Sequence, residues 1–278
     1  MKRVKHIALV AATVAMASVT GAAFAATVPD SIALTKHNLS STSAFNGTTG
    51  TTEICVFCHT PHGATTAQSI PLWNRNTTVA TAYTTYDDLG SSTLDGTIDM
   101  NGSVSLACLS CHDGQIAMDS LLNTPGSGTD PAAAALWQFT SAATPATITA
   151  EGFLAPGSIA MLDTDLRDDH PVGILYAGGG VDATPAKSEF ADADFKVPVY
   201  EVINGGEYWY VDTPIGVTGE RTRTDMILYT RVDAGTPKPF VECASCHDPH
   251  VGSFDTNQVM FLRVSNEGSA LCLACHDK

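Results

Sequence analysis

Four copies of the pattern Cys-x-x-Cys-His constrain this chain more than any other feature. They occupy residues 55–59, 108–112, 243–247 and 272–276, numbered here as motifs one to four. In c-type haem attachment, two thiols bond the porphyrin edge and the adjacent imidazole binds the iron. The motifs contain all eight cysteines, so no thiol remains for a disulfide or a catalytic nucleophile. The sequence therefore predicts four covalently bound haems c, attached through Cys55, Cys58, Cys108, Cys111, Cys243, Cys246, Cys272 and Cys275.

A Cys-x-x-Cys pair also occurs in zinc sites and in dithiol redox centres. Histidine is scarce here, with nine copies in 278 residues, yet one follows every cysteine pair. Chance rarely produces that arrangement four times, so the pattern favours haem.

The N-terminus is typical of a secretory signal. Lys2, Arg3 and Lys5 precede an apolar run at 7–19 and a small-x-small sequence at 23–25. We expect residues 1–25 to be removed, no membrane anchor, and a single tetrahaem domain at 26–278. This predicts a secreted protein, extracellular or on the outer cell surface, with the periplasm as the alternative.

The net charge limits the partners. It is −15 for the whole chain, and loss of three basic residues with the signal lowers it to −18. Such an acidic surface disfavours nucleic acid and anionic membranes as partners.

The histidine count matches four irons with two axial ligands each. The motifs provide His59, His112, His247 and His276, and the chain after the signal contains four others: His37, His62, His170 and His250. Methionine is the competing ligand and would raise the reduction potential. No methionine recurs in a repeated context, so apolar packing is the expected role of this residue type. The sequence therefore predicts four bis-histidine haems.

Two of the added histidines follow a motif histidine by three residues, His62 after His59 and His250 after His247. Residues three apart on a helical turn point the same way, whereas the two ligands of one iron lie on opposite porphyrin faces. We therefore expect His62 and His250 each to bind a different haem from that of the preceding motif. Only two residues follow His276, so the second ligand of the fourth haem is expected from earlier in the chain or from another molecule.

Regular secondary structure should be scarce, because four apolar porphyrins can themselves form the core. We predict mostly coil, with short helices at the haem motifs and a small central β-region. That region falls in the motif-free middle stretch, 113–242, where 199–203 and 207–212 flank the turn residues 204–206 and form a hairpin. Residues 226–232 are a further expected strand.

Several segments carry a family resemblance: Lys-His-Asn-Leu-Ser at 36–40, the flanked motif at 54–63, Asp-His-Pro-Val-Gly at 169–173, and 243–250. With these, nearly the whole chain after the signal resembles the tetrahaem outer-surface cytochromes of metal-reducing bacteria, which polymerise into extracellular filaments. The resemblance implies a head-to-tail homopolymer that exchanges electrons with other redox cytochromes and extracellular acceptors. It also implies that His62 binds the fourth haem of a neighbouring subunit, leaving His250 for the second haem, His37 for the first and His170 for the third.

Three functions fit these predictions unequally. An extracellular electron conduit is favoured, and a monomeric periplasmic or cell-surface shuttle is the alternative. A multihaem reductase would need an open coordination position. Because the histidine count leaves none, the sequence predicts no enzymatic activity.

Overall fold

The computed structural model describes residues 31–66, 69–78, 82–125, 137–143, 145–215, 218–252 and 261–277. The predicted signal peptide at 1–25 lies outside these ranges. Within them, the helices are η1 Ile32–Leu34, η2 Cys55–Phe57, η4 Tyr86–Leu89, α1 Ser105–His112, η5 Tyr176–Gly178, η6 Lys187–Glu189, α3 Cys243–Cys246, η7 Glu267–Ser269 and α4 Ala270–Cys275. The strands are β1 Asn46–Thr48, β2 Phe139–Ser141, β3 Ile174–Leu175, β4 Val199–Ile203, β5 Gly206–Val211, β6 Met226–Asp233 and β7 Thr236–Val241. No helix in the described ranges has the length and apolar character needed to cross a bilayer.

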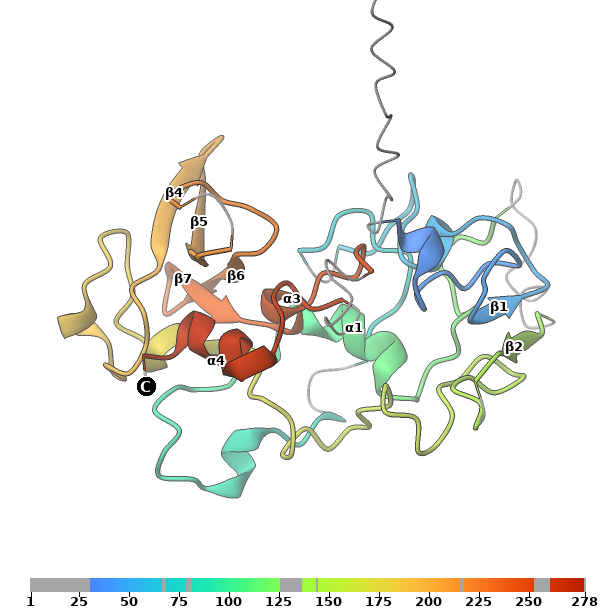
Figure 1. The fold of residues 1–278 in the computed structure, drawn as a ribbon, viewed down its shortest axis with the longest axis horizontal. Helices are drawn as coiled ribbons and strands as arrows, with labels where there is room; N and C mark the ends of the chain where they lie inside the picture. The colour runs from blue at the N-terminus through green and yellow to red at the C-terminus, as the bar shows by residue number, and fades with distance from the viewer. Residues whose placement is uncertain are drawn as a thin grey trace, which may run out of the picture.

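The strands form two separate sheets. A five-stranded antiparallel sheet has the order β3-β7-β6-β5-β4, and β1 pairs with β2 in a small second sheet. Figure 1 shows the large sheet and α4 at one end of the molecule, β1 and β2 at the other, and α1 and α3 between them. The haem motifs are thus distributed along the long axis.

Two hairpins of the large sheet close through two-residue turns with positive φ. Asn204 (φ 51°) and Gly205 (φ 82°) join β4 to β5, and Ala234 (φ 47°) and Gly235 (φ 86°) join β6 to β7. Turns with positive φ at both positions match the right-handed twist of the paired strands, and Asn-Gly is the preferred sequence. The β4–β5 hairpin lies within one residue of the strands expected at 199–203 and 207–212.

Strand β7 was missed from the sequence because it contains Pro237 and Pro239. Proline has no N–H and is excluded from positions bonded on both sides. In the structure, Pro237 and Pro239 face Val232 and Thr230 of β6, whereas β3 reaches only Phe240 and Val241. The prolines therefore lie where β7 is an open edge.

The polypeptide has apolar clusters of its own at both ends, in addition to any core that haems provide. One cluster packs the large sheet against α4 and includes the fully buried Trp209, Met226 and Leu228. The other packs motif one against β2 and includes Phe57 and Phe139. Each cluster holds attachment cysteines at its border, which fixes the motifs to rigid structure.

Candidate haem-binding sites

Each Cys-x-x-Cys segment lies on a helical turn: η2 for motif one, α1 for motif two, α3 for motif three and α4 for motif four. Helical residues three apart share one side, so both thiols of a motif can reach one porphyrin edge. Antiparallel bridges then fix the backbone of three of the motif histidines: His59 with Trp73, His247 with Leu262 and His276 with Phe195.

The structure corrects one premise about His62 and His250. The helical turns end at Phe57 and Cys246, so neither histidine shares a helical turn with the motif histidine before it. His247 has extended backbone angles, φ −108° and ψ 136°. The direction of the His250 side chain relative to that of His247 is therefore set by extended backbone at His247 and not by a helical turn.

Two histidine pairs face one another across distances suited to one iron. The ring centres of His59 and His250 are 6.2 Å apart, and those of His37 and His112 are 6.1 Å apart. An imidazole nitrogen binds a transition metal at about 2 Å and the ring centre lies about 1 Å beyond, so two axial imidazoles have centres about 6 Å apart. The ring planes meet at 14° and 74°, and both angles are open to axial ligands because each ring can rotate about its metal–nitrogen bond.

These ring contacts favour a different pairing from the one that the family resemblance implies. That resemblance gave His250 to the second haem and His37 to the first, whereas the structure places His250 opposite His59 and His37 opposite His112. The cause is the 247–250 segment, which crosses to motif one. In the same place, the carbonyl of Pro249 accepts a hydrogen bond from Nδ1 of His37 (3.1 Å).

Five of the histidines have Nδ1 held by an oxygen atom. The pairs are His59 with the Pro71 carbonyl (2.8 Å), His112 with the Ala160 carbonyl (2.7 Å), His37 with the Pro249 carbonyl (3.1 Å), His170 with the Pro171 carbonyl (3.0 Å) and His250 with the Asp248 carboxylate (3.2 Å). These oxygens accept, so Nδ1 carries the proton and Nε2 keeps a free lone pair. Metal-binding histidines characteristically have their second ring nitrogen held in this way.

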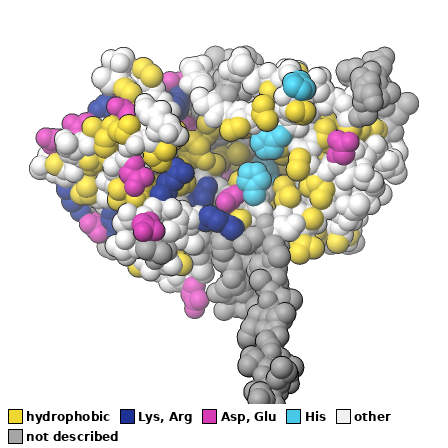
Figure 2. Space-filling view, turned by 90° about the horizontal axis from the view of Figure 1, so that it is seen from above, with side chains coloured by type: hydrophobic (Ala, Val, Ile, Leu, Met, Phe, Trp, Pro, Cys, Tyr) yellow, Lys and Arg dark blue, Asp and Glu magenta, His cyan; other side chains and the backbone are white. Residues whose placement is uncertain are grey.

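The surroundings also keep His37 neutral, which is the form that binds a metal. Loss of solvent is the main cause, and the nearby His112 the next, of a pKa of His37 lowered to about 4. Figure 2 shows histidine side chains close together on one face of the molecule, between apolar side chains and beside a group of Lys and Arg side chains. Such a surface suits an apolar porphyrin with carboxylate substituents.

An orphaned donor next to His59 tests the fit to haem. Trp73 is 8% exposed, its indole Nε1–H has no hydrogen-bond partner, and its ring lies 6.1 Å from that of His59. A buried N–H without an acceptor is costly, and haem carries carboxylates that can accept from it. The residues around motif one therefore fit the group that the motif predicts.

Neighbouring attachment cysteines connect the motifs in sequence order: Cys58 and Cys111 pack against one apolar cluster, and Cys246 and Cys275 pack against the other. Burial raises the pKa of Cys58 to about 12, and the neighbouring Cys111 of motif two adds to the rise. Cys108 of motif two hydrogen-bonds to Cys243 of motif three, and this bond is the main cause of the raised pKa of Cys108. Burial raises the pKa of Cys275 in motif four to about 12, with a further contribution from Cys246 of motif three. Motifs one, two, three and four therefore form a row of contacts.

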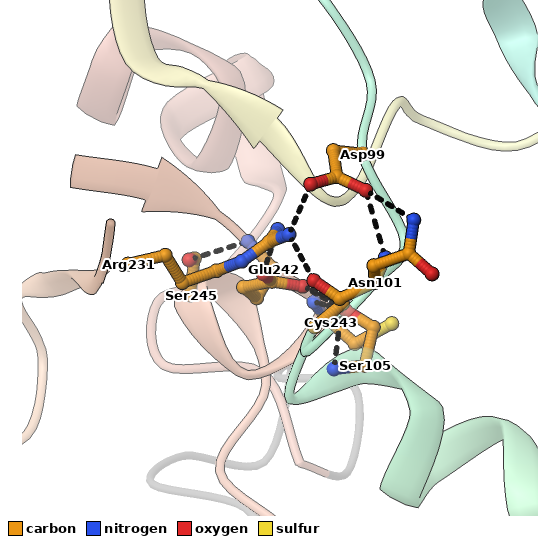
Figure 3. A network of polar contacts seen from close by, with 8 residues as sticks. Asp99, Asn101, Ser105, Arg231, Glu242, Cys243 and Ser245 are labelled. Atoms are coloured by element: carbon orange, nitrogen blue, oxygen red, sulfur yellow. Dashed lines mark hydrogen bonds and ion pairs between the residues drawn. The ribbon is translucent and has the colours of Figure 1, made fainter. Parts of the chain in front are cut away.

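A buried polar network joins motif three to α1 (Figure 3). The Glu242 carboxylate, adjacent to Cys243, is fully buried and accepts hydrogen bonds from Ser105 Oγ (2.5 Å), from Ser103 Oγ, and from Arg231 Nη1 (3.1 Å). Ser105 Oγ also accepts a bond from the backbone N–H of Cys243 (3.0 Å). This network holds the starts of α1 and α3 together, and with them the contact between Cys108 and Cys243.

The remaining predicted ligands, His62 and His170, are exposed, and no ring contact joins either to another histidine in the described part of the chain. His170 comes four residues before Ile174, which pairs with Val241 just ahead of motif three. His62 is held near motif one, because its carbonyl accepts from Asn123 Nδ2 (3.0 Å). No local pattern in the sequence marks Trp73 or Glu242, because the roles of both residues depend on burial.

The observed pairing predicts how two substitutions combine. His250→Ala should convert one ferric haem from six-coordinate low spin to high spin, because the iron opposite His59 loses its second ligand. In a background lacking the first haem, Cys55→Ser with Cys58→Ser, the same substitution should produce no new high-spin signal. Magnetic circular dichroism of the ferric proteins measures both.

The reciprocal experiment is the control. His37→Ala should still give a high-spin signal in the background lacking the first haem, and lose it when Cys108 and Cys111 are replaced instead. A high-spin signal from His250→Ala that persists without the first haem would contradict the pairing.

Comparison with known proteins agrees with the motif chemistry. Residues 238–278, which contain motifs three and four, match a protein-family model described as "Doubled CXXCH motif". No curated protein matches the chain. The matched motif indicates covalently bound c-type haem, as in a c-type cytochrome that takes part in electron transfer.

Proposed function

We propose that this protein conducts electrons through four bis-histidine c-type haems arranged in the order of motifs one, two, three and four. The adjacency of successive motifs is the observation that carries the proposal. Cys58 and Cys111 border one apolar cluster, the backbone of Cys243 bonds to Ser105 of α1, and Cys246 and Cys275 border the other cluster. Each thiol bonds a porphyrin edge in haem attachment. Neighbouring thiols therefore bring the edges of successive haems together, which favours transfer from one haem to the next.

The ligand set favours conduction over catalysis. His59 with His250 and His112 with His37 can close the first two haems, and His170 lies near motif three. With His62 as the last ligand, no coordination position stays open for a substrate. In such a protein the polypeptide contributes spacing, axial ligation and control of potential.

The positions of the motifs support assembly into a head-to-tail homopolymer. Motif one borders the cluster that contains β2, and motif four borders the cluster of the large sheet. These regions lie at opposite ends of the molecule (Figure 1). His62, held near motif one, is therefore too remote to bind the fourth haem of its own chain and is well placed to bind that of a neighbour.

This assembly fits an exported protein that passes electrons to other redox cytochromes and to extracellular acceptors. The predicted signal at 1–25 and the strongly acidic composition agree with that location. Because like-charged subunits repel, polymerisation must depend on specific bonds. A ligand shared between subunits is such a bond.

Substitution of His62 tests the assembly. His62→Ala should abolish long filaments in electron micrographs of the haem-loaded protein, because the haem of motif four loses its second ligand across the interface. Thr66→Ala, a change at an exposed residue four positions away, is the matched control and should leave filaments unchanged.

Size-exclusion chromatography of the unsubstituted protein separates the conduit from the shuttle. A polymer elutes far ahead of the monomer mass. Elution of the fully loaded protein as a monomer, or filaments of normal length from His62→Ala, would count against the shared ligand.

A further inference from the structure

A single segment, residues 73–75, braces motif one against motif two. The backbone N–H of Asn74 donates to the Cys58 carbonyl (2.9 Å), and Asn74 Nδ2 donates to the Val56 carbonyl (2.7 Å). The next residue, Arg75, reaches into α1, where its Nε and Nη2 donate to Oγ (3.3 Å) and to the carbonyl (2.9 Å) of Ser110. Ser110 lies between the two attachment cysteines of motif two. Arg75 therefore bonds directly to motif two, and its chain neighbour Asn74 bonds to motif one.

The Arg75 guanidinium is fully buried and has only neutral hydrogen-bond acceptors. Beyond Ser110, it donates to the carbonyls of Met118 (2.7 Å) and Ala117 (2.9 Å). Among the described residues, no carboxylate oxygen lies within salt-bridge distance of it. Asp119 lies within the electrostatic influence of Arg75, which opposes the rise that burial causes in the pKa of this carboxyl group.

Two other arginines with little exposure lie beside carboxylates: the buried Arg263 lies 3.8 Å from Asp248, and the half-buried Arg231 has two such partners. Arg231 lies 3.1 Å from Glu242 and 3.3 Å from Asp99, so two carboxylates compensate its charge next to motif three. Carbonyl dipoles solvate the Arg75 charge without cancelling it. At its own site, the Arg75 charge therefore lacks the carboxylate partners that Arg231 has. The fully buried Asp113, which directly follows motif two, is instead bonded by the hydroxyls of Thr78 (2.6 Å) and Tyr83 (2.8 Å).

The Arg75 charge affects the equilibrium between oxidation states. One-electron reduction of a haem iron from ferric to ferrous removes one positive charge from the centre. A fixed cation nearby repels the ferric form more than the ferrous form, and so favours reduction. At an effective dielectric of about 20, a unit charge about 10 Å away changes such an equilibrium by roughly tenfold.

We propose that Arg75 raises the reduction potentials of the two haems attached by motifs one and two above the values that bis-histidine ligation alone would give them. Arg75 is a positioning and tuning residue, since it touches the attachment segments rather than the iron. The inference rests on the proposed attachment of haem at these motifs, but not on filament formation.

Arg75→Met tests the inference, because it removes the charge while keeping the length of the side chain. In a spectroelectrochemical titration of the haem-loaded protein, two of the four one-electron steps should move to lower potential. The equilibrium constant for electron exchange between each of these two haems and a mediator should change by about tenfold. Arg75→Lys keeps the charge and loses the forked bonds, so the potentials should stay near those of the unsubstituted protein. Arg167→Met removes an exposed, ion-paired arginine and is the matched control without a shift.

Ser110→Asp provides a second way to neutralise the charge if Arg75→Met fails to load haem, since it places a carboxylate against Nε of Arg75. It should shift the same two steps in the same direction. Equal potentials in Arg75→Met and the unsubstituted protein, equal shifts in the Met and Lys variants, or loss of haem from both neutralised variants would each overturn the proposal. Four low-spin haems with unchanged potentials would leave the electron-transfer function intact, so the two failures are distinguishable.

Discussion

Glu242→Ala is expected to lower the free energy of unfolding by about 3–5 kcal/mol, the cost of removing one partner from a buried ion pair. The substitution leaves the Arg231 guanidinium, whose side chain is 10% exposed, with the partly exposed Asp99 as its only carboxylate partner within 4.0 Å in the described ranges. It also leaves the hydroxyls of Ser103 and Ser105 without their acceptor. Denaturant titration of the haem-loaded protein measures the loss.

An exposed ion pair provides the control for that measurement. Asp165 and Arg167 are 2.6 Å apart, but both side chains are about half exposed. Asp165→Ala should therefore lower the free energy of unfolding far less than Glu242→Ala does, because solvent screens surface ion pairs. A loss from Glu242→Ala that is no larger than the loss from Asp165→Ala would contradict the structural role assigned to the network.

Replacing both Cys243 and Cys246 with serine is expected to interrupt electron transfer between the two ends of the protein. The third haem is then not attached, and the contacts of motif two with motif three and of motif three with motif four lose their function. Haem content should fall by one per chain, and the rate of electron passage through the assembled protein should fall by orders of magnitude. Pyridine haemochrome analysis and conductance of filaments measure the two effects.

The position in the row should matter as much as the number of haems. In the isolated monomer, loss of the first haem, Cys55→Ser with Cys58→Ser, removes an end of the row. Transfer among the other three haems should then continue, whereas loss of the third haem separates the fourth from the rest. Equal internal transfer rates in the two three-haem proteins would contradict the sequential order.

Haem attachment was predictable from the sequence, because the motif is local, and the family match at 238–278 agrees with it for motifs three and four. Bis-histidine ligation, which follows from the histidine count, stays a prediction. The β4–β5 hairpin was also predictable, since Asn204-Gly205 matches the positive φ that a two-residue turn requires. The β6–β7 hairpin was not, because Ala234 is an unfavourable residue for the same turn and Pro237 and Pro239 mask the strand. Sequence rules for turns therefore predict a hairpin only where the turn residues are of the types that favour positive φ.

The contacts between histidine rings required the structure, and the ligand pairing that they favour stays a prediction. His250 lies opposite His59, and His37 lies opposite His112, only because distant segments cross near Pro249. Nothing in the local sequence of His37 or His250 specifies that crossing. The family resemblance implies the opposite assignment, with His37 on the first haem and His250 on the second. The tuning role inferred for Arg75 likewise depends on burial and on the absence of a carboxylate from its described surroundings, which no sequence pattern encodes.

A cryo-microscopy map of the haem-loaded protein tests the central claim most directly. The account predicts four haems in the order of their motifs, with His59 and His250 on opposite faces of the first and His112 and His37 on opposite faces of the second. A map in which haems of consecutive motifs are not neighbours, or in which His250 binds any iron other than that of His59, would contradict it.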